Sequence, residues 1–472
     1  MVTGEREPAV PAEAHESARH GLARLSALAT IPDIPMRYRA PLLTAGFLIV
    51  GALGVTWWVS LISEFAGPIT QSGHHDFFAF YSAGTLIREG QPQSLYNAST
   101  LTALERHIWP HPTGYAGYMP FLNPPSAAVI LSPLASLPFA TARLLWLAIS
   151  IALAIACAPV LTSGHDLRIR GLAVVAVLAT FPAYQTFTEG QWSFVMLLGA
   201  LGALVMARRH LDWLAGALLL SLWLKPPLFL LVLVWLLITR HWRIAAGAVG
   251  AVIMLTLVTL PWTGFGADVN YIQYLGGVTA AHATGSGAVG STTWEGALPN
   301  MEGLIGLAAT LAGQAHPLAV DVLTGVMAAG LLAYFVWDTR SRWLARPLPL
   351  QVALAALCLG LLLDPHLYAQ DCVLIVVLVA VTLSRTRISA PSVLLGGAAL
   401  MDLSAIDTYW IQGVFVTPLH LLTFVLIAGV MAFGRPVKVR LFRSPKLSHR
   451  TRRRKGGWIR LGFTQESRHH QD

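Results

Sequence analysis

The sequence predicts an all-α polytopic membrane protein, and three observations lead to that prediction. Of the 472 residues, 55% are hydrophobic and only 12% charged, whereas a soluble domain carries about 25% charged residues. Apolar runs recur as far as residue 433. Lysines and arginines gather in alternate segments between these runs, as they do in proteins that cross a bilayer repeatedly. We therefore expect a membrane domain at 41–433, a mostly disordered extension at 1–40 and a basic tail at 434–472.

Crossing a hydrocarbon core about 30 Å thick takes about twenty helical residues, and the apolar runs predict about 11–12 transmembrane helices. The predicted spans are 41–63, 138–162, 171–188, 191–207, 211–224, 226–239, 243–262, 318–337, 347–363, 372–384, 391–405 and 413–433. Pro226 and Pro227 split one pair, which is expected to bend because proline cannot continue the helical hydrogen bonds. The shorter apolar stretch 124–135 is expected to be re-entrant or interfacial.

The basic residues predict the orientation of the chain. Four of the 32 lysines and arginines fall outside one set of alternate segments, namely Arg88, Arg106, Arg143 and Lys225. Cytoplasmic loops carry an excess of Lys and Arg, so both termini are expected in the cytoplasm and the protein in the cell (plasma) membrane. The long loops 64–137 and 263–316 are then expected on the non-cytoplasmic face.

The net charge of +9 does not indicate a nucleic-acid partner, because most of it lies in the tail, including Arg452–Lys455. A basic run beside a span binds anionic lipid headgroups at about 1 kcal/mol per charge. It could equally serve only to fix the topology. The three cysteines lie in or beside apolar runs and predict no disulfide framework and no zinc site.

Acidic and polar side chains collect on the predicted outer face. Asp76 precedes a predicted helix at 77–88, where it could act as a helix cap or as a general base. Lys225 lies among apolar residues, so it must pair with an acid or reach toward the interface. The Glu189-Gly190-Gln191 segment could be only a tight turn, and His366 could be merely solvated.

The order of several short motifs resembles a known family. Asp76-Phe77-x-x-Phe80-Tyr81-x-Ala83-Gly84 follows the first span. A proline ladder then runs from Pro124 to Pro138, followed by Gly190-Gln191, Leu224-Lys225-Pro226-Pro227 and a late Pro365-His366 turn before Asp371. In this order the motifs resemble the family 87 glycosyltransferases, membrane enzymes of the GT-C class that include polyprenyl-phosphate-mannose-dependent mannosyltransferases. The chain departs from that pattern at Asn123 and Gln370, where the family often has tyrosine.

The resemblance implies a GT-C-like bundle with interfacial helices in the first outer loop, and an acidic catalytic base at the position of Asp76. It also implies a hexosyltransferase, expected to be a mannosyltransferase, with a polyprenyl-phosphate sugar donor and a lipid or glycan acceptor. The residues expected to bind the donor phosphate or the substrates are Arg88, Lys225, His366, Gln191, Glu189, Tyr81 and Asp371. No metal and no cofactor are expected, since the sequence has no nucleotide-binding glycine loop and His74-His75-Asp76 is a weak metal motif.

Such a donor would keep its lipid chain in the bilayer and its phosphosugar at the outer interface. One carboxylate near the acceptor hydroxyl can then act as the base of an inverting transfer. Two other classes of protein fit the same pattern. A transporter or flippase of lipid-linked sugars should show two related halves, and a non-catalytic subunit of envelope glycan assembly would keep the fold without needing Asp76.

Overall fold

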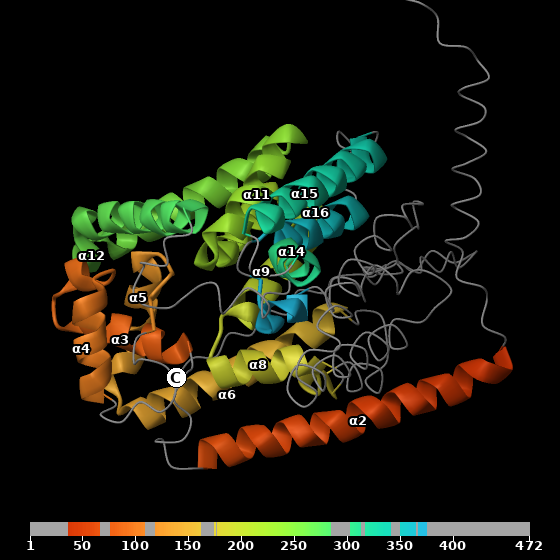
Figure 1. The fold of residues 1–472 in the computed structure, drawn as a ribbon, viewed down its shortest axis with the longest axis horizontal. Helices are drawn as coiled ribbons and strands as arrows, with labels where there is room; N and C mark the ends of the chain where they lie inside the picture. Colours follow the sequence, from red (N-terminus) through yellow and green to blue (C-terminus); the bar gives the residue numbers. More distant parts are fainter. Residues whose placement is uncertain are drawn as a thin grey trace, which may run out of the picture.

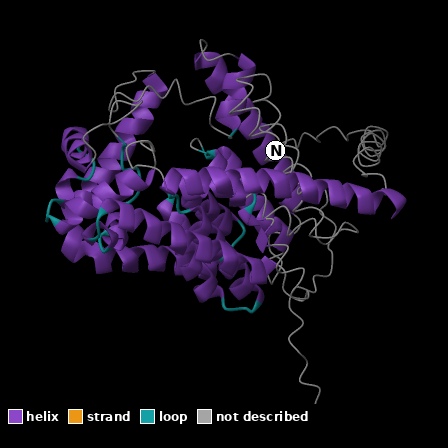
Figure 2. Ribbon diagram, turned by 90° about the horizontal axis from the view of Figure 1, so that it is seen from below, coloured by secondary structure: helices purple, strands orange, loops and turns teal. Residues whose placement is uncertain are grey.

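The computed structural model of the protein describes residues 36–66, 76–108, 119–161, 174–175, 177–284, 303–312, 317–340, 350–364 and 367–374. These ranges contain helices and no strand (Figure 2). Within them, three helical segments are long and apolar enough to cross a membrane, at Phe139–Cys157, Trp242–Gly277 and Leu318–Trp337. The predicted all-α polytopic membrane fold is therefore confirmed. The predicted spans 391–405 and 413–433, with both polar extensions except 36–40, lie outside the described residues.

Eleven helices of different lengths in the described residues form a bundle (Figure 1). Its members are α2 (Met36–Ala66), α6 (Phe139–Leu161), α8 (Phe181–Glu189), α9 (Ser193–Arg208), α10 (Asp212–Leu218), η4 (Leu219–Leu224), α11 (Pro226–Ile238), α12 (Trp242–Thr284), α14 (Leu304–Ala312), α15 (Pro317–Thr339) and α16 (Leu350–Leu363). The first of these, α2, lies along α8, where Trp57 stacks on Tyr184 with ring centroids 5.3 Å apart. The turn η7 (Ala369–Asp371) follows α16 and packs against α8.

A group of short helices from the predicted first outer loop, called the outer group, lies at one end of the bundle (Figure 1, orange). It consists of α3 (Asp76–Arg88), η2 (Pro92–Ser94), α4 (Ala98–Ile108), α5 (Pro125–Leu131) and η3 (Leu134–Ser136). The helix predicted after Asp76 is α3, and nine of its 13 residues are buried. Its aromatic side chains pack in several directions, with Phe77 against Trp146 and Phe80 against Trp192. Since burying one such side chain contributes about 1.5–3 kcal/mol, this packing fixes the position of α3.

The described parts of the spans predicted at 171–188 and 191–207 include two helices joined by a sharp bend. The short α8 meets α9 at an angle of 118°. Thr180 caps the start of α8, where its Oγ1 accepts from the Ala183 amide at 3.3 Å. Gly190 ends the helix in the left-handed conformation, with φ of 69°, which glycine adopts without steric cost. A Cβ on Gly190 would lie 2.5 Å from Phe77 Cβ, so the bend also needs glycine to approach α3.

The second outer loop, predicted over 263–316, begins as helix. Helical structure in α12 continues to Thr284, with a break at Gly264, where φ is 64° and ψ is 153°. Pro261, one turn earlier, weakens the helical hydrogen bonds at the same place. The segment after Gly264 stays helical because it packs on the outer group, with Tyr271 donating to the Leu122 carbonyl at 3.3 Å. The end of the apolar run in the sequence therefore predicted the end of the span near this break. It did not predict the end of the helix, which lies further along the chain.

Small residues bring α10 and α12 close together. A Cβ on Gly216 would lie 2.1 Å from the Ile244 carbonyl oxygen, and one on Gly247 would lie 2.5 Å from the Trp213 carbonyl oxygen. Glycine at helix–helix contacts lets backbones approach in this way in membrane proteins. A larger side chain at either glycine would therefore push α10 and α12 apart.

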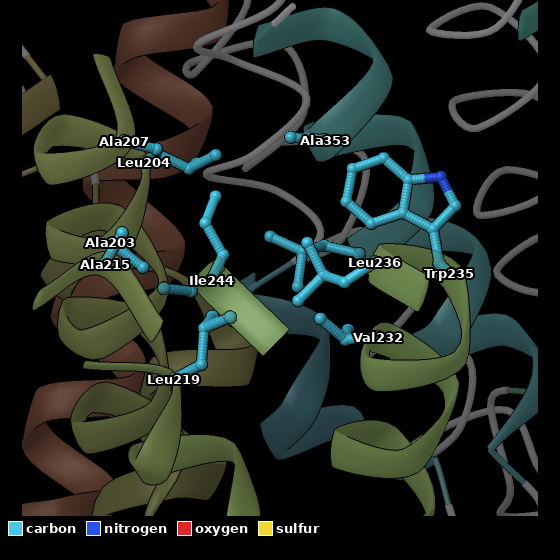
Figure 3. A pocket seen from close by; sticks show the side chains of 12 residues that line it. Ala203, Leu204, Ala207, Ala215, Leu219, Val232, Trp235, Leu236, Ile244 and Ala353 are labelled. Carbon is cyan, nitrogen blue, oxygen red and sulfur yellow. The ribbon is translucent and has the colours of Figure 1, made fainter. Parts of the chain in front are cut away.

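An apolar cavity lies beside this packing, between α9, α10, α11, α12 and α16 (Figure 3). Its lining is aliphatic apart from Trp235, and alanines of α9 face it from one side (Figure 3). It is close to the turns that carry Arg209 and Arg240. Its lining offers no charged group.

Candidate active site

Lys225 is the centre of a buried ion cluster. Its Nζ lies 2.5 Å from Asp371 Oδ2 and 2.9 Å from Asp364 Oδ2. The lysine side chain is 18% exposed and the two carboxylates are 5% and 0% exposed. Taking such charges out of water costs several kcal/mol per ion, so each charge in the cluster requires the others. Of the two outcomes expected for Lys225, pairing and reaching toward the interface, the structure has pairing.

The break between η4 and α11 presents the lysine to these acids. Lys225 has φ of −130° and ψ of 81°, outside the helical region, because a residue before proline is disfavoured in the α conformation. Its side chain therefore does not continue the helical arrangement of side chains on η4 and α11. The Leu224 carbonyl beside it accepts from Asn123 Nδ2 at 2.7 Å. This bond ties the proline ladder of the outer group to the break.

The turn that carries Asp371 is held against the start of α9. Ser193 Oγ donates to Asp371 Oδ1 at 3.4 Å, and the Tyr368 amide donates to Asp371 Oδ2 at the same distance. Thr186 Oγ1, in α8, donates to the Gln370 carbonyl at 3.0 Å. The bent pair α8–α9 thus positions the late turn through two bonds, from Ser193 and Thr186.

Asp76 is the first residue of α3, and it faces the α8–α9 bend. Gln191 Nε2 donates to its Oδ2. The positive end of the α3 dipole favours a carboxylate there. The charge of Asp76 also acts on Tyr368, as do the charges of the Lys225 cluster. Residues from α3, the α8–α9 bend and the 364–371 turn therefore come together, although 115 positions separate Asp76 from Gln191.

Burial and charge set the protonation of this cluster. Burial alone would lower the pKa of Lys225, but Asp364 and Asp371 raise it above its usual value, so the amine stays charged. Burial raises the pKa of Asp371, and Lys225 opposes that effect only in part. Burial and the charge of Asp76 raise the pKa of Tyr368. Tyr368 is therefore a neutral phenol at physiological pH, able to donate a hydrogen bond.

Other predicted site residues lie elsewhere or have other partners. Arg88 is exposed, and its Nη1 donates to the Ala135 carbonyl at 2.5 Å. Tyr81 donates to the Leu137 carbonyl at 2.8 Å. Both side chains thus bind the turn before α6, away from the ion cluster. The charge of Glu189 acts on Arg143. His366 lies outside the described residues.

Two site residues, Asp364 and Tyr368, were not among the predicted set. One sequence signal could have found Asp364, since a lysine among apolar residues needs a countercharge and Asp364 and Asp371 flank the same late turn. Tyr368 carries no comparable signal. Within the described ranges, no group of three or more His, Cys, Asp or Glu side chains is placed to hold a metal ion.

The fold and the site define a class of protein: a polytopic helical membrane protein with carboxylates and one lysine gathered among its helix ends. The sequence model of glycosyltransferase family 87 matches residues 121–365, just over half of the chain. The protein belongs to glycosyltransferase family 87. Its membership makes it a membrane glycosyltransferase, acting on a sugar donor and an acceptor, and does not favour the transporter alternative. No curated protein and no solved structure matches the chain.

Proposed function

We propose that the protein transfers a hexosyl residue, specifically mannosyl, from a polyprenyl-phosphate donor to a lipid or glycan acceptor on the non-cytoplasmic face of the plasma membrane. The observation that carries the proposal is the contact between Asp76 and Gln191 beside the Lys225 ion cluster. It sets a carboxylate at a helix start, with one oxygen engaged by an amide, in a chain of a glycosyltransferase family.

The proposed step is a single displacement. The acceptor hydroxyl oxygen forms a bond to the anomeric carbon while Asp76 takes up the hydroxyl proton. The bond between the anomeric carbon and the phosphate oxygen breaks, and polyprenyl phosphate leaves with the electron pair. Attack from the face opposite the leaving group inverts the anomeric configuration, with the hydroxyl in the place of the base-activated water of an inverting hydrolase.

Gln191 supports Asp76 in this proposal by fixing the direction of its carboxylate. The amide engages Oδ2, so Oδ1 is the oxygen proposed to receive the proton. A base held in one orientation avoids the loss of rate that follows from misplacement of reacting groups. The bent α8–α9 pair, which carries Gln191, is thus part of the proposed catalytic geometry.

The leaving phosphate needs positive charge or hydrogen-bond donors. Arg88 is engaged with the Ala135 carbonyl and Lys225 with two carboxylates. We therefore propose that Lys225 acts mainly by holding Asp364 and Asp371 in place. His366, between these two acids in the sequence, remains the proposed phosphate contact, and the neutral Tyr368 hydroxyl is a second donor close to Asp76.

Asp76→Asn tests the proposal. Asn keeps the size of the side chain and keeps an oxygen for Gln191 Nε2, but it cannot take up the proton. Membranes with the variant should transfer radiolabelled sugar from polyprenyl-phosphate mannose roughly two to four orders of magnitude more slowly than wild-type membranes, at equal protein level. Polyprenyl-phosphate glucose in parallel tests the sugar, and NMR of the product tests inversion.

Gln191→Glu is the matched control for the contact. It keeps the length of the side chain but places a carboxylate against Asp76, so activity should fall with a changed pH profile and not be abolished at all pH values. Full activity of Asp76→Asn would exclude Asp76 as the base, and Glu295, Glu302 and Asp371 would be the next acids to examine.

A further inference from the structure

Three tyrosines form a stack outside the ion cluster. Tyr96, which follows η2, has its ring centroid 5.2 Å from that of Tyr271 and 5.3 Å from that of Tyr274. Tyr271 is buried, and Tyr96 and Tyr274 are half-buried. The stack therefore presents part of its aromatic surface to the outside. We call these three residues the tyrosine stack.

The tyrosine stack lies where the second part of α12 packs on the short helices η2 and α5. The helix from Trp242 to the break at Gly264 has 23 residues, and at 1.5 Å per residue it spans a hydrocarbon core about 30 Å thick. The residues after Gly264 are therefore not needed to cross that core. They pack on η2 and α5 of the outer group, which places the tyrosine stack at the same end of the bundle as Asp76.

Polar groups border the tyrosine stack. Asn270 Nδ2 donates to both the backbone oxygen and Oε1 of Gln93, at 3.3 Å each. Asp268 acts electrostatically on Tyr96, and its Oδ2 is buried without a hydrogen bond from the described residues. A buried carboxylate oxygen without a donor is costly. The stack thus combines aromatic faces with amides and an acceptor that a ligand could satisfy.

This combination matches a sugar better than a lipid headgroup. A pyranose has apolar C–H faces that pack on aromatic rings and hydroxyls that bond to amides and carboxylates, and binding sites commonly join apolar walls with a few placed polar groups. Tyrosines that only anchor a protein at the membrane interface need no such polar border. An anionic headgroup would be repelled by Asp268.

The tyrosine stack is joined to the ion cluster through one segment of chain. Tyr96 donates to the Asn123 carbonyl at 2.8 Å, and Tyr271 donates to the Leu122 carbonyl at 3.3 Å. Asn123 in turn donates to the carbonyl of Leu224, the residue before Lys225. The segment Leu122–Asn123 thus contacts both the tyrosine stack and the break beside Lys225.

We propose that the tyrosine stack, with Gln93, Asn270 and Asp268, binds a sugar residue of the acceptor, so that the acceptor is a glycan or carries one. The role as an acceptor site rests on the proposed function, whereas the binding of a sugar does not. Asp268 accepts hydrogen bonds from the sugar hydroxyls, and Tyr274 packs on an apolar face of the ring.

Sugar binding is tested first without catalysis. The full-length protein in nanodiscs is titrated with three soluble trisaccharides that end in mannose, glucose or galactose, and binding is followed by saturation-transfer NMR. Tyr274→Ala removes a half-exposed ring and Asp268→Asn removes the charge at constant size. Each should weaken the binding of the preferred trisaccharide roughly 2- to 10-fold or more. Tyr334→Ala, which removes a ring that pairs with Trp337 in α15, is the matched control and should leave binding unchanged.

Transfer kinetics separate this inference from the proposed function. In membranes that transfer sugar, Tyr274→Ala and Asp268→Asn should raise the acceptor KM while the donor KM stays within twofold. Trisaccharide binding that the variants weaken, without any transfer by wild-type protein, would contradict the proposed function and support the sugar site. Transfer with an unchanged acceptor KM in both variants, or no binding of any trisaccharide, would overturn the sugar site. Tyr274→Phe, which keeps the ring, serves if Tyr274→Ala does not fold.

Discussion

Replacing Lys225 by methionine tests how the ion cluster holds the site together. Methionine keeps the length and apolar character of the lysine stem but leaves Asp364 and Asp371 buried without their shared cation. Removing one partner of a buried ion pair costs about 3–5 kcal/mol, because an uncompensated charge stays behind. The two carboxylates are 0% and 5% exposed, so water cannot replace the lysine without local opening. We expect the melting temperature of the purified protein to fall by on the order of 5 °C.

The effect should depend on pH in a defined direction. Burial already raises the pKa of Asp371 in the presence of Lys225, and removing the lysine removes the largest effect that opposes burial. The folded variant then binds a proton more tightly than the unfolded chain. Its free energy of unfolding should therefore decrease as the pH rises above about 4, the usual carboxyl pKa. The stability difference from wild type should be larger at pH 8 than at pH 5.

A triple variant supplies the control. Lys225→Met together with Asp364→Asn and Asp371→Asn removes all three charges, and replacement of a whole buried ion group is often neutral for stability. The melting temperature, measured by fluorescence-detected size exclusion after heating, should largely recover while transfer activity does not. A single variant as stable as wild type, or a triple variant no more stable than the single one, would refute the reasoning.

Three further outcomes are expected. Gly190→Ala should lower stability by about 1–2 kcal/mol from its left-handed backbone alone, with a further loss from the contact with Phe77, measured by the same melting assay; unchanged melting would argue against the α8–α9 bend. Arg88→Ala should leave the donor KM within twofold in the membrane assay, because Arg88 binds a carbonyl, and a tenfold rise would return it to the phosphate site. Cysteine in place of the exposed Glu89 should react with a membrane-impermeant maleimide in intact cells, and cysteine in place of the exposed Arg209 only after permeabilisation; the reverse pattern would invert the proposed topology.

Much of the fold follows from local features of the sequence. The break at Lys225 was predictable because Pro226 and Pro227 cannot continue a helix, and the structure begins α11 at Pro226. The helix after Asp76 was also predictable, because Asp76 can cap its start. The continuation of α12 beyond Gly264 was not, because it depends on the packing of Tyr271 against a segment about 150 positions earlier, at Leu122.

The site was less predictable, because its contacts join distant positions. Asp371 reaches Lys225 across 146 positions, and a single sequence does not report such pairs. The sequence also did not show which neighbours the side chains of Arg88 and Tyr81 contact. Nine residues of α3 are buried, so the helix has no clear polar face from which to judge which side chains meet the site. The polar side chains of such a helix can form hydrogen bonds to the neighbouring turn as readily as they can contact substrates in the active site.

The charge of the cluster limits how a phosphate donor can bind. With Asp76, Asp364 and Asp371 ionised and Lys225 protonated, these four side chains carry three negative charges and one positive charge. In a site of low dielectric, that excess would repel a phosphate. A donor phosphate therefore needs either a cationic group from beyond the cluster or the proton that the raised pKa of Asp371 makes available. Protonation of Asp371 would reduce the negative charge and weaken its hold on Lys225, so donor affinity should rise as the pH falls.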